Sequence, residues 1–340
     1  MTHTSITPAD SARSPRTTAP ARRTVLRTAA TAATALACIG GLAACADETD
    51  DNAGSANGAG SGDDKLTVFA TTGYLADAAK QIAPEAEIIT LVGPGGDPHT
   101  YQPTTQDIDT MRNSDVVLWN GLHLEAQMDQ QLESLGDKQV AVGDQLDESK
   151  LLPWPEADEE GEPEYDPHIW NSPELWQEVV DIVADHISEI DPDGADEYQA
   201  AADKYNEEIA ALHKEAEEAL SDLSSRFLVT GHDAFNYLGD TYDLDVEATD
   251  FVSTEAEKSA TELDELAEKV AENKVPTIFY DNQVNPQAIN ALSEAVSSRG
   301  WEVNISDEEL FADSLGAEAP VDTYLGAFRH NFEAIAAALK

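Results

Sequence analysis

Residues 193–223 read DGADEYQAAADKYNEEIAALHKEAEEALSDL and predict one long amphipathic helix. Apolar or small side chains recur at helical spacing, with charged residues between them: Tyr198, Ala202, Tyr205, Ile209, Leu212, Ala216 and Leu220. At about 1.5 Å rise per residue, such a helix is roughly 45 Å long. A rigid segment of this length divides the chain into a part before it and a part after it.

Each part alternates short β-type runs with helical stretches. Before the helix we predict strands in LTVFA (66–70), AEIITLV (86–92), DVVLWN (115–120) and KQVAV (138–142), with helices over 74–82, 105–111 and 125–135. After it we predict strands in RFLVT (226–230), VPTIFYD (275–281) and WEVNI (301–305), with helices over 257–272, 286–298 and 321–339. Strands separated by helices are typical of parallel sheets. We therefore expect an α/β fold with two lobes, at 65–192 and 224–340, whose mainly parallel sheets are joined by the rigid helix at 193–223.

The N-terminal region has the layout of an export signal. A basic region ends in Arg22-Arg23, a Thr/Ala-rich apolar stretch follows, and Leu42-Ala43-Ala44-Cys45 closes it. These last four residues resemble the lipobox of bacterial lipoproteins, in which the cysteine is acylated and becomes the new first residue. We expect residues 1–44 to be a lipoprotein signal peptide, exported by either the twin-arginine or the general route. Cys45 then anchors the chain by lipid to the outside of the bacterial cell membrane.

Residues 45–64 form a Gly/Ala/Ser/Asp tract that cannot bury a core, so we expect a flexible linker between anchor and folded part. The chain has only two cysteines, Cys38 and Cys45. Only Cys45 would remain after cleavage, so the mature chain can form neither an internal disulfide nor a thiolate metal site.

The chain is strongly acidic, with 67 Asp and Glu against 19 Lys and Arg and a formal net charge of −48. Such a charge repels nucleic acid phosphates, which excludes nucleic acid as a partner. The charge by itself does not indicate a metal site, because a solvated acidic surface has the same composition.

One tripeptide, Asp-Pro-His, occurs twice in a chain that has only eight histidines. The first copy ends at His99, after a Gly/Pro turn that closes the second predicted strand, and the second ends at His168. Proline fixes φ ahead of each imidazole, and the aspartate can accept a hydrogen bond from backbone or ring N–H, so both rings would be presented rigidly. Either histidine alone could be an ordinary turn residue, but the pair points to metal ligands.

Two further candidates follow predicted strands of the second part. His232 stands where RFLVT ends, at the carboxyl end of a strand, where open α/β sheets bind ligands. Taken alone, it could equally be a surface or helix-capping histidine. Asp313 lies in a loop after WEVNI, and alone it could be any loop acid.

Five motifs in order carry a family resemblance over nearly the whole mature chain. They are Asp97-Pro98-His99-x-Tyr101-x-Pro103, Asn120-Gly121-x-x-x-Glu125, Asp166-Pro167-His168-x-Trp170, His232-Asp233-Ala234-Phe235 and Asp313-Ser314-Leu315. Together they resemble the solute-binding lipoproteins of ABC importers for zinc and manganese.

The resemblance implies that His99 and His168 from the first lobe and His232 and Asp313 from the second hold the ion in the cleft between the lobes. Three imidazoles and one carboxylate suit tetrahedral Zn²⁺. Family members thought to favour Mn²⁺ often have glutamate where His232 stands, although some members with three histidines bind both ions. Zinc members often carry a His-rich loop before the second Asp-Pro-His, whereas residues 155–165 here are acidic and lack histidine. The remaining histidines, including His123 near the cleft, are not expected to be ligands.

We therefore expect a monomeric extracytoplasmic lipoprotein, not an enzyme and without a catalytic cofactor, that captures Zn²⁺, or alternatively Mn²⁺, and delivers it to an ABC importer permease. A metal-containing adhesin or scaffold lipoprotein is the alternative. A metallohydrolase is a further one, against which the chain has no His-Glu-x-x-His and no evident general base beside the four residues.

Overall fold

The first lobe is built on a four-stranded parallel sheet. The computed structural model describes residues 65–154, 165–252, 254, 258–282 and 286–340. The sheet has the order β2-β1-β3-β4, with β1 at Thr67–Ala70, β2 at Glu87–Thr90, β3 at Val116–Trp119 and β4 at Gln139–Ala141. These four strands confirm the predicted ones.

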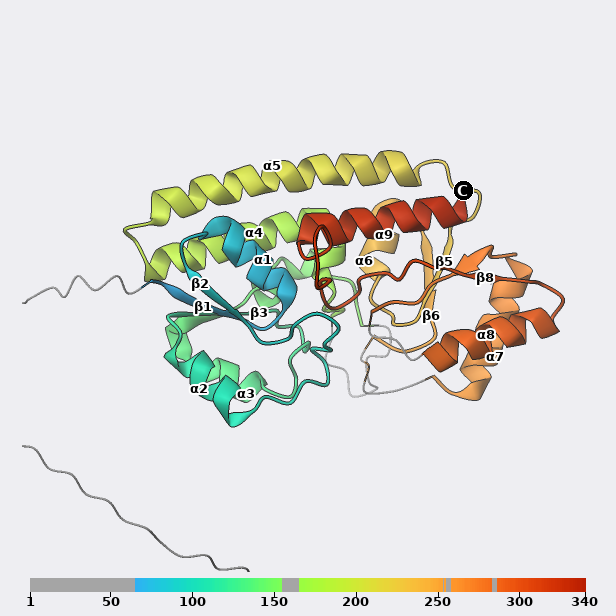
Figure 1. Ribbon diagram of the computed structural model, residues 1–340, viewed down its shortest axis with the longest axis horizontal. Coiled ribbons are helices and arrows are strands. Elements are labelled where there is room, and N and C mark those ends of the chain that lie inside the picture. Colours follow the sequence, from blue (N-terminus) through green and yellow to red (C-terminus); the bar gives the residue numbers. More distant parts are fainter. Residues whose placement is uncertain (1–64, 155–164, 253, 255–257, 283–285) are drawn as a thin grey trace, which may run out of the picture. The chain divides into compact units, whose positions relative to one another are not determined.

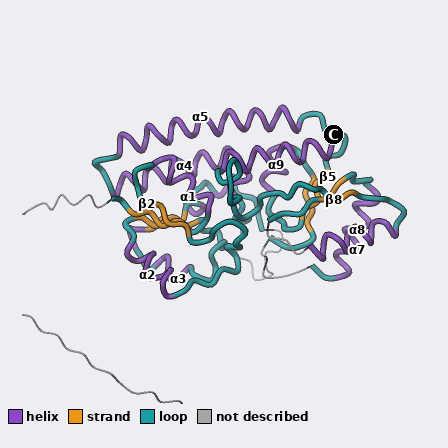
Figure 2. The backbone as a smooth tube through the Cα atoms, viewed as in Figure 1, coloured by secondary structure: helices purple, strands orange, loops and turns teal. Residues whose placement is uncertain are grey.

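Both faces of this sheet are covered, which is why its central strands β1 and β3 are apolar except for Thr67 at the start of β1. Val68 and Val116 point into the main core, while Phe69 and Val117 point into a smaller cluster with Met111 on the opposite face. The alternation follows from the two-residue period of a strand. The sheet therefore lies between helices, as Figure 2 shows.

The second lobe repeats this topology. Strand β5 (Phe227–Thr230) pairs in parallel with β6 (Asp245–Ala248), and β7 (Thr277–Ile278) pairs in parallel with β8 (Asn304–Ile305). The Phe279 N–H donates to the Val229 carbonyl at 2.9 Å and joins the two pairs. The resulting order, β6-β5-β7-β8, matches that of the first lobe. Strand β6 was not predicted, because its sequence DVEA lies in an acidic stretch without an apolar run.

Four helices pack together along one side of both lobes: α1 (Gly73–Ile82), α4 (Pro173–Ile190), α5 (Ala195–Leu220) and α9 (Tyr324–Leu339). Helix α5 is the long helix predicted from its amphipathic pattern. Six of the seven residues of that pattern are buried, from Ala202 to Leu220, and Tyr198 is half-buried. It contacts α1 and α4 as well as α9, and Figure 1 shows it running beside all of them. No helix in the described part of the chain is long and apolar enough to cross a membrane.

The other α-helices in the described part of the chain are α2 (Thr105–Asn113), α3 (Asp129–Glu133), α6 (Asn236–Tyr242), α7 (Ala260–Glu272) and α8 (Pro286–Ser298). Helix α3 is much shorter than the predicted 125–135. Gly121, Leu122 and His123 all have positive φ, at 74°, 52° and 70°, and the Glu125 side chain turns back to bind the backbone of this turn. The chain continues in turns as far as residue 128, where the Met128 N–H donates to the Glu125 carbonyl at 2.8 Å, and the helix begins only at Asp129.

One continuous apolar core passes through both lobes. It includes residues of β1 and β3 in the first lobe, of α4 and α5, and of β5, α6 and α9 in the second. Its largest side chains include Trp170, Trp176 and Tyr324. Because core packing is dense, a wide separation of the lobes would open this core, so the fold favours small relative movements.

A buried carboxylate in this core joins three helices. Asp77 of α1, 6% exposed, accepts hydrogen bonds from the Tyr205 hydroxyl of α5 at 2.9 Å and from the Tyr324 N–H at the start of α9 at 3.0 Å. The contact with α9 also places a negative charge at a helix N-terminus, where it is favourable. Asp77 therefore ties the first lobe to the last helix of the chain.

We predict that Asp77→Ala lowers the free energy of unfolding of the metal-free protein by about 2–4 kcal/mol, because two buried donors lose their acceptor. Tyr205→Phe, which removes only one of these hydrogen bonds, serves as the matched variant and should cost about 1 kcal/mol. Urea denaturation followed by circular dichroism measures both. A loss below about 0.5 kcal/mol for Asp77→Ala, the range of ordinary surface substitutions, would contradict the role assigned to this carboxylate.

Candidate metal centre

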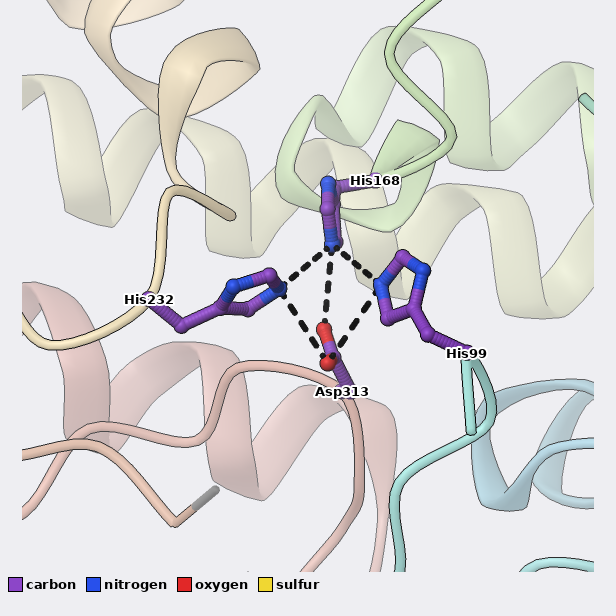
Figure 3. Close-up of side chains that lie close together, drawn as sticks. All are labelled: His99, His168, His232 and Asp313. Atoms are coloured by element: carbon purple, nitrogen blue, oxygen red, sulfur yellow. Dashed lines mark hydrogen bonds and ion pairs between the residues drawn. The ribbon is translucent and has the colours of Figure 1, made fainter. Parts of the chain in front are cut away.

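Four side chains from distant parts of the sequence meet between the two lobes. One nitrogen or oxygen atom from each lies within 4.8 Å of the others, and each residue is at most 3% exposed: His99, His168, His232 and Asp313. These are the four residues singled out from the sequence, and Figure 3 shows their donor atoms facing a common centre. We refer to them as the four-residue cluster. It is the one such group found among the described residues.

The two Asp-Pro-His copies form the same local turn. The His99 N–H donates to Asp97 Oδ1 at 2.9 Å, and the His168 N–H donates to Asp166 Oδ1 at 2.9 Å. Each aspartate thus closes a short turn over the proline and aims the following imidazole. His99 is reached from β2 of the first lobe, whereas His168 lies just before the turn that leads into α4.

The spacing of the donor atoms fits a tetrahedral ion. The His168 Nε2 lies 3.4 Å from the His99 Nε2, 3.1 Å from the His232 Nε2 and 3.2 Å from Asp313 Oδ1. Asp313 Oδ2 lies 3.3 Å from the His232 Nε2 and 3.7 Å from the His99 Nε2. Ligands about 2.0–2.1 Å from a tetrahedral centre are about 3.3–3.4 Å apart. The five distances lie between 3.1 and 3.7 Å and use both carboxylate oxygens of Asp313, so the cluster is close in size to a zinc coordination shell.

Partners outside the cluster orient two of the rings. The His168 Nδ1 lies 2.7 Å from Asp166 Oδ1, and the His232 Nδ1 lies 2.9 Å from the Phe251 carbonyl. Since both partners are acceptors, each Nδ1 carries the proton, and in the neutral ring Nε2 presents a lone pair to the centre. This is the arrangement that metal-binding histidines adopt.

Burial and charge set the protonation of the cluster. Burial lowers the pKa of His99 to about 3, against the raising effect of Asp313. Burial also acts to lower the pKa of His168, but Asp166 and Asp313 outweigh it and raise this pKa to about 10. Burial would raise the pKa of Asp313, yet His232 and His168 hold it well below its usual range. Without an ion, the cluster thus keeps an ionised carboxylate beside a protonated His168.

The loop that carries Asp313 is fixed by two buried or half-buried amides of the second lobe. Asn282 Oδ1 accepts from the Ala312 N–H at 3.0 Å, and its Nδ2 donates to the Ser314 carbonyl at 2.7 Å. Asn331 of α9 makes hydrogen bonds to both the N–H and the carbonyl of Phe311, each at 2.8 Å. Sequence reasoning missed both asparagines. The position of Asn282 directly after a predicted strand was a usable signal.

Asp281 was also missed. Its Oδ2 accepts a hydrogen bond from the His232 N–H at 2.5 Å, and a side chain at Gly231 would collide with the same oxygen at 2.8 Å. The segment after β5 and the segment after β7 therefore lie side by side here, and only glycine at position 231 leaves space for the Asp281 carboxylate. Asp281 holds the backbone of His232 and does not belong to the cluster.

The Asn120–Glu125 turn supports His168 through the backbone before it. Glu125 is buried and accepts from the Thr71 hydroxyl at 2.6 Å and from the Asn120 N–H at 2.9 Å, while Asn120 Nδ2 donates to the Pro167 carbonyl at 3.0 Å. Burial raises the pKa of Glu125 to about 7. The motif thus orients the second Asp-Pro-His turn and adds no donor atom to the centre. The histidines that were not expected to be ligands, His123, His186, His213 and His330, all lie outside the cluster.

Comparison with known proteins identifies the family of the chain. The family model described as zinc-uptake complex component A, periplasmic (ZnuA), matches residues 68–338. The manganese-binding lipoprotein MntA of Bacillus subtilis is 34% identical over 286 residues, which covers 82% of this chain and 92% of MntA. The zinc-binding protein TroA of Treponema pallidum is 36% identical over 283 residues, covering 82% of this chain and 90% of TroA.

A solved structure of the periplasmic zinc-binding protein TroA from Treponema pallidum has a TM-score of 0.76 with this chain at 36% sequence identity. The match covers 81% of this chain and 99% of that one. The resemblance inferred from the five motifs is thereby confirmed. The chain belongs to the ZnuA family of metal-uptake binding proteins.

Proposed function

We propose that this protein captures a transition-metal ion outside the cytoplasm and delivers it to the permease of an ABC importer, with Zn²⁺ as the preferred ion and Mn²⁺ as the alternative. The carrying observation is the set of three imidazoles and one carboxylate, buried and spaced for a tetrahedral ion. In this proposal His99, His168, His232 and Asp313 are the ligands.

The donor set favours zinc over manganese. Imidazole suits zinc, whereas manganese prefers carboxylate, carbonyl and water oxygens at higher coordination numbers. Here three of four donors are imidazoles. The relatives named above do not decide the ion, because one is named for manganese and the other for zinc.

The geometry also favours capture over catalysis. Four protein ligands complete a tetrahedral shell, and a catalytic zinc needs an open position for water or substrate. The four residues are nearly inaccessible to solvent. This argues against the metallohydrolase. A scaffold or adhesin with a structural metal remains the alternative function, and it differs in that loss of the ion would unfold the protein and leave uptake intact.

We also propose that the chain is a monomeric lipoprotein. Its parts are a signal peptide at 1–44, a linker at 45–64 that begins with the acylated Cys45, a first lobe at 65–192, the connecting helix at 193–223 and a second lobe at 224–340. Residues 1–64 and 155–164 lie outside the described part of the chain, so this rests on the sequence and on the lipoprotein names of relatives such as MntA. In this proposal the acidic stretch at 155–165 contributes no metal ligand.

We predict that the full chain, purified in detergent, binds one zinc ion tightly, and that His232→Ala weakens zinc binding by more than about 100-fold. Loss of a partner outside the ligand shell alone typically costs about 10–100-fold in affinity, and loss of a ligand costs more. Competitive titration with zinc and manganese measures both affinities. His186→Gln, a change on α4 outside the cluster, is the matched control and should leave them unchanged.

Tight manganese binding with weak zinc binding would make Mn²⁺ the preferred ion in this proposal and leave the four proposed ligands unchanged. Failure to bind either ion tightly would contradict the four-ligand site.

We predict that zinc affinity rises with pH between 6 and 8. The pKa of His168 is raised to about 10, so its ring carries a proton over this whole range and zinc must displace it. His99, with a pKa of about 3, releases none. Burial acts to lower the pKa of His232, but Asp313 outweighs it and raises this pKa, so His232 adds to the protons released. Displacement of at least one proton gives an increase of at least about tenfold per pH unit. Calorimetry in buffers of different ionisation enthalpy counts the protons released at pH 7.

Asp166→Asn provides the matched variant, because it removes a charge that raises the pKa of His168. Its pH dependence should be shallower than that of the unmodified protein. A zinc affinity that does not change between pH 6 and 8 would show that His168 is already neutral without the ion.

We predict that Cys45 is the site of acylation. In a bacterial host supplied with radioactive palmitate, the unmodified chain should be labelled and found in the membrane fraction. The Cys45→Ser variant should carry no label and should not be found in the membrane fraction. Cys38→Ser is the matched control, because Cys38 lies within the proposed signal peptide and its loss should not affect labelling. Persistent labelling of Cys45→Ser would place the lipid elsewhere.

A further inference from the structure

The carbonyl group of Ala312 accepts two hydrogen bonds from the opposite lobe. The Tyr74 hydroxyl of α1 donates to it at 2.9 Å, and the Trp170 indole N–H donates to it at 2.8 Å. A carbonyl oxygen has two lone pairs, so both are used. This carbonyl belongs to the peptide group whose nitrogen is that of Asp313. The two donors therefore fix the peptide plane from which the Asp313 carboxylate extends.

Trp170 contacts the first-lobe side of the cluster as well. Its ring packs edge-on against the His168 ring, with centroids 5.2 Å apart and planes at 75°. The Tyr74 ring stacks on the Trp170 ring at 4.9 Å and 18°. Both aromatic residues are at most 2% exposed. One rigid pair of rings thus touches a ligand of the first lobe and holds the backbone of a ligand of the second.

Other hydrogen bonds to the loop that carries Asp313 come either from its own lobe or from the opposite lobe. Asn282 and Asn331 hold it to its own lobe. Across the lobes, the bonds to the Ala312 carbonyl are joined by one from the Gly95 N–H to the Ser314 hydroxyl at 2.9 Å. Movement of Asp313 away from His168 requires the hydrogen bonds to the Ala312 carbonyl to break, whereas movement of the loop together with its lobe does not disturb the two asparagines.

We infer that Tyr74 and Trp170 are positioning residues that hold Asp313 against His168 and thereby slow the release of the bound ion. The inference rests on the proposed metal site. Asp313 and His168 must separate for the ion to leave, so loss of either positioning residue should raise the dissociation rate. Burial, with the charge of Asp313, raises the pKa of Tyr74 well above its usual value, so the hydroxyl remains a donor at neutral pH.

The chain offers a closely matched control in Tyr324. This residue is buried in the same aromatic group, with its ring 6.4 Å from that of Tyr74, and its hydroxyl has no hydrogen-bond partner among the described residues. Tyr324→Phe therefore removes a buried tyrosine hydroxyl without removing a bond between the lobes. Tyr74→Phe removes the same atom together with its bond to the Ala312 carbonyl at 2.9 Å and its longer contact with the Phe311 carbonyl at 3.4 Å.

The experiment measures zinc association and dissociation rates by stopped flow, using the full chain in detergent and a chromogenic chelator for release. Tyr74→Phe should raise the dissociation rate by about fivefold to tenfold, the effect of one neutral hydrogen bond. Trp170→Phe should act in the same direction. Tyr324→Phe should release zinc at the rate of the unmodified protein. Melting temperatures of the metal-free variants separate a general loss of stability from this kinetic effect.

An unchanged dissociation rate in Tyr74→Phe would overturn the inference, and so would an equal increase in Tyr324→Phe. Failure of the unmodified protein to bind zinc is a different result, because it would overturn the proposed function itself. Faster release from Tyr74→Phe alone, at unchanged zinc stoichiometry, supports both.

Discussion

The crowding of three imidazoles and one carboxylate in a buried space is the constraint on which the rest of the molecule depends. Burial of an ionised group is costly unless opposite charge and hydrogen bonds compensate it. In this cluster the compensation comes from a proton or a cation at the centre and from acceptors behind the rings, such as Asp166 and the Phe251 carbonyl. Much of the polar structure around the site, from Asn120 to Asn331, serves to hold these groups at distances they would not keep by themselves.

The repeated topology explains how four distant residues reach one point. In the orders β2-β1-β3-β4 and β6-β5-β7-β8, the carboxyl ends of parallel strands lie at one edge of each lobe. His99 follows β2, His232 follows β5 and Asp313 follows β8, so three of the four come from such edges. His168 is the exception, because it enters from the loop before α4. Its placement therefore needs separate support, which Glu125 and Asn120 give.

The elements that could be predicted from the sequence are those with a strong local signal. The strands were predicted from short apolar runs and α5 from its helical period, and the repeated Asp-Pro-His marks two of the cluster residues by itself. His232 and Asp313 depended on the family resemblance, since a lone histidine or loop acid has no distinctive pattern. Strand β6 was missed because DVEA has no apolar run and owes its pairing to β5. Helix α3 was predicted too long because residues 124–128 form turns that no local pattern marks. Asn282 and Asn331 contact backbone groups far away in sequence, which no local pattern encodes.

The bond between Asp77 and the Tyr324 N–H joins residues 247 positions apart, and this has a consequence for how the molecule is made. Synthesis proceeds from the N-terminus, and early parts of a chain begin to fold while later parts are still being added. Helix α1 can pack against α4 and α5 early in synthesis. The Asp77 carboxylate of α1 gains its bond to the Tyr324 N–H only when α9, the last helix of the chain, has been made. Asp313 likewise emerges after all three histidines. A growing or truncated chain therefore has the imidazoles without their carboxylate, and the complete donor set is assembled only when almost the whole polypeptide is present.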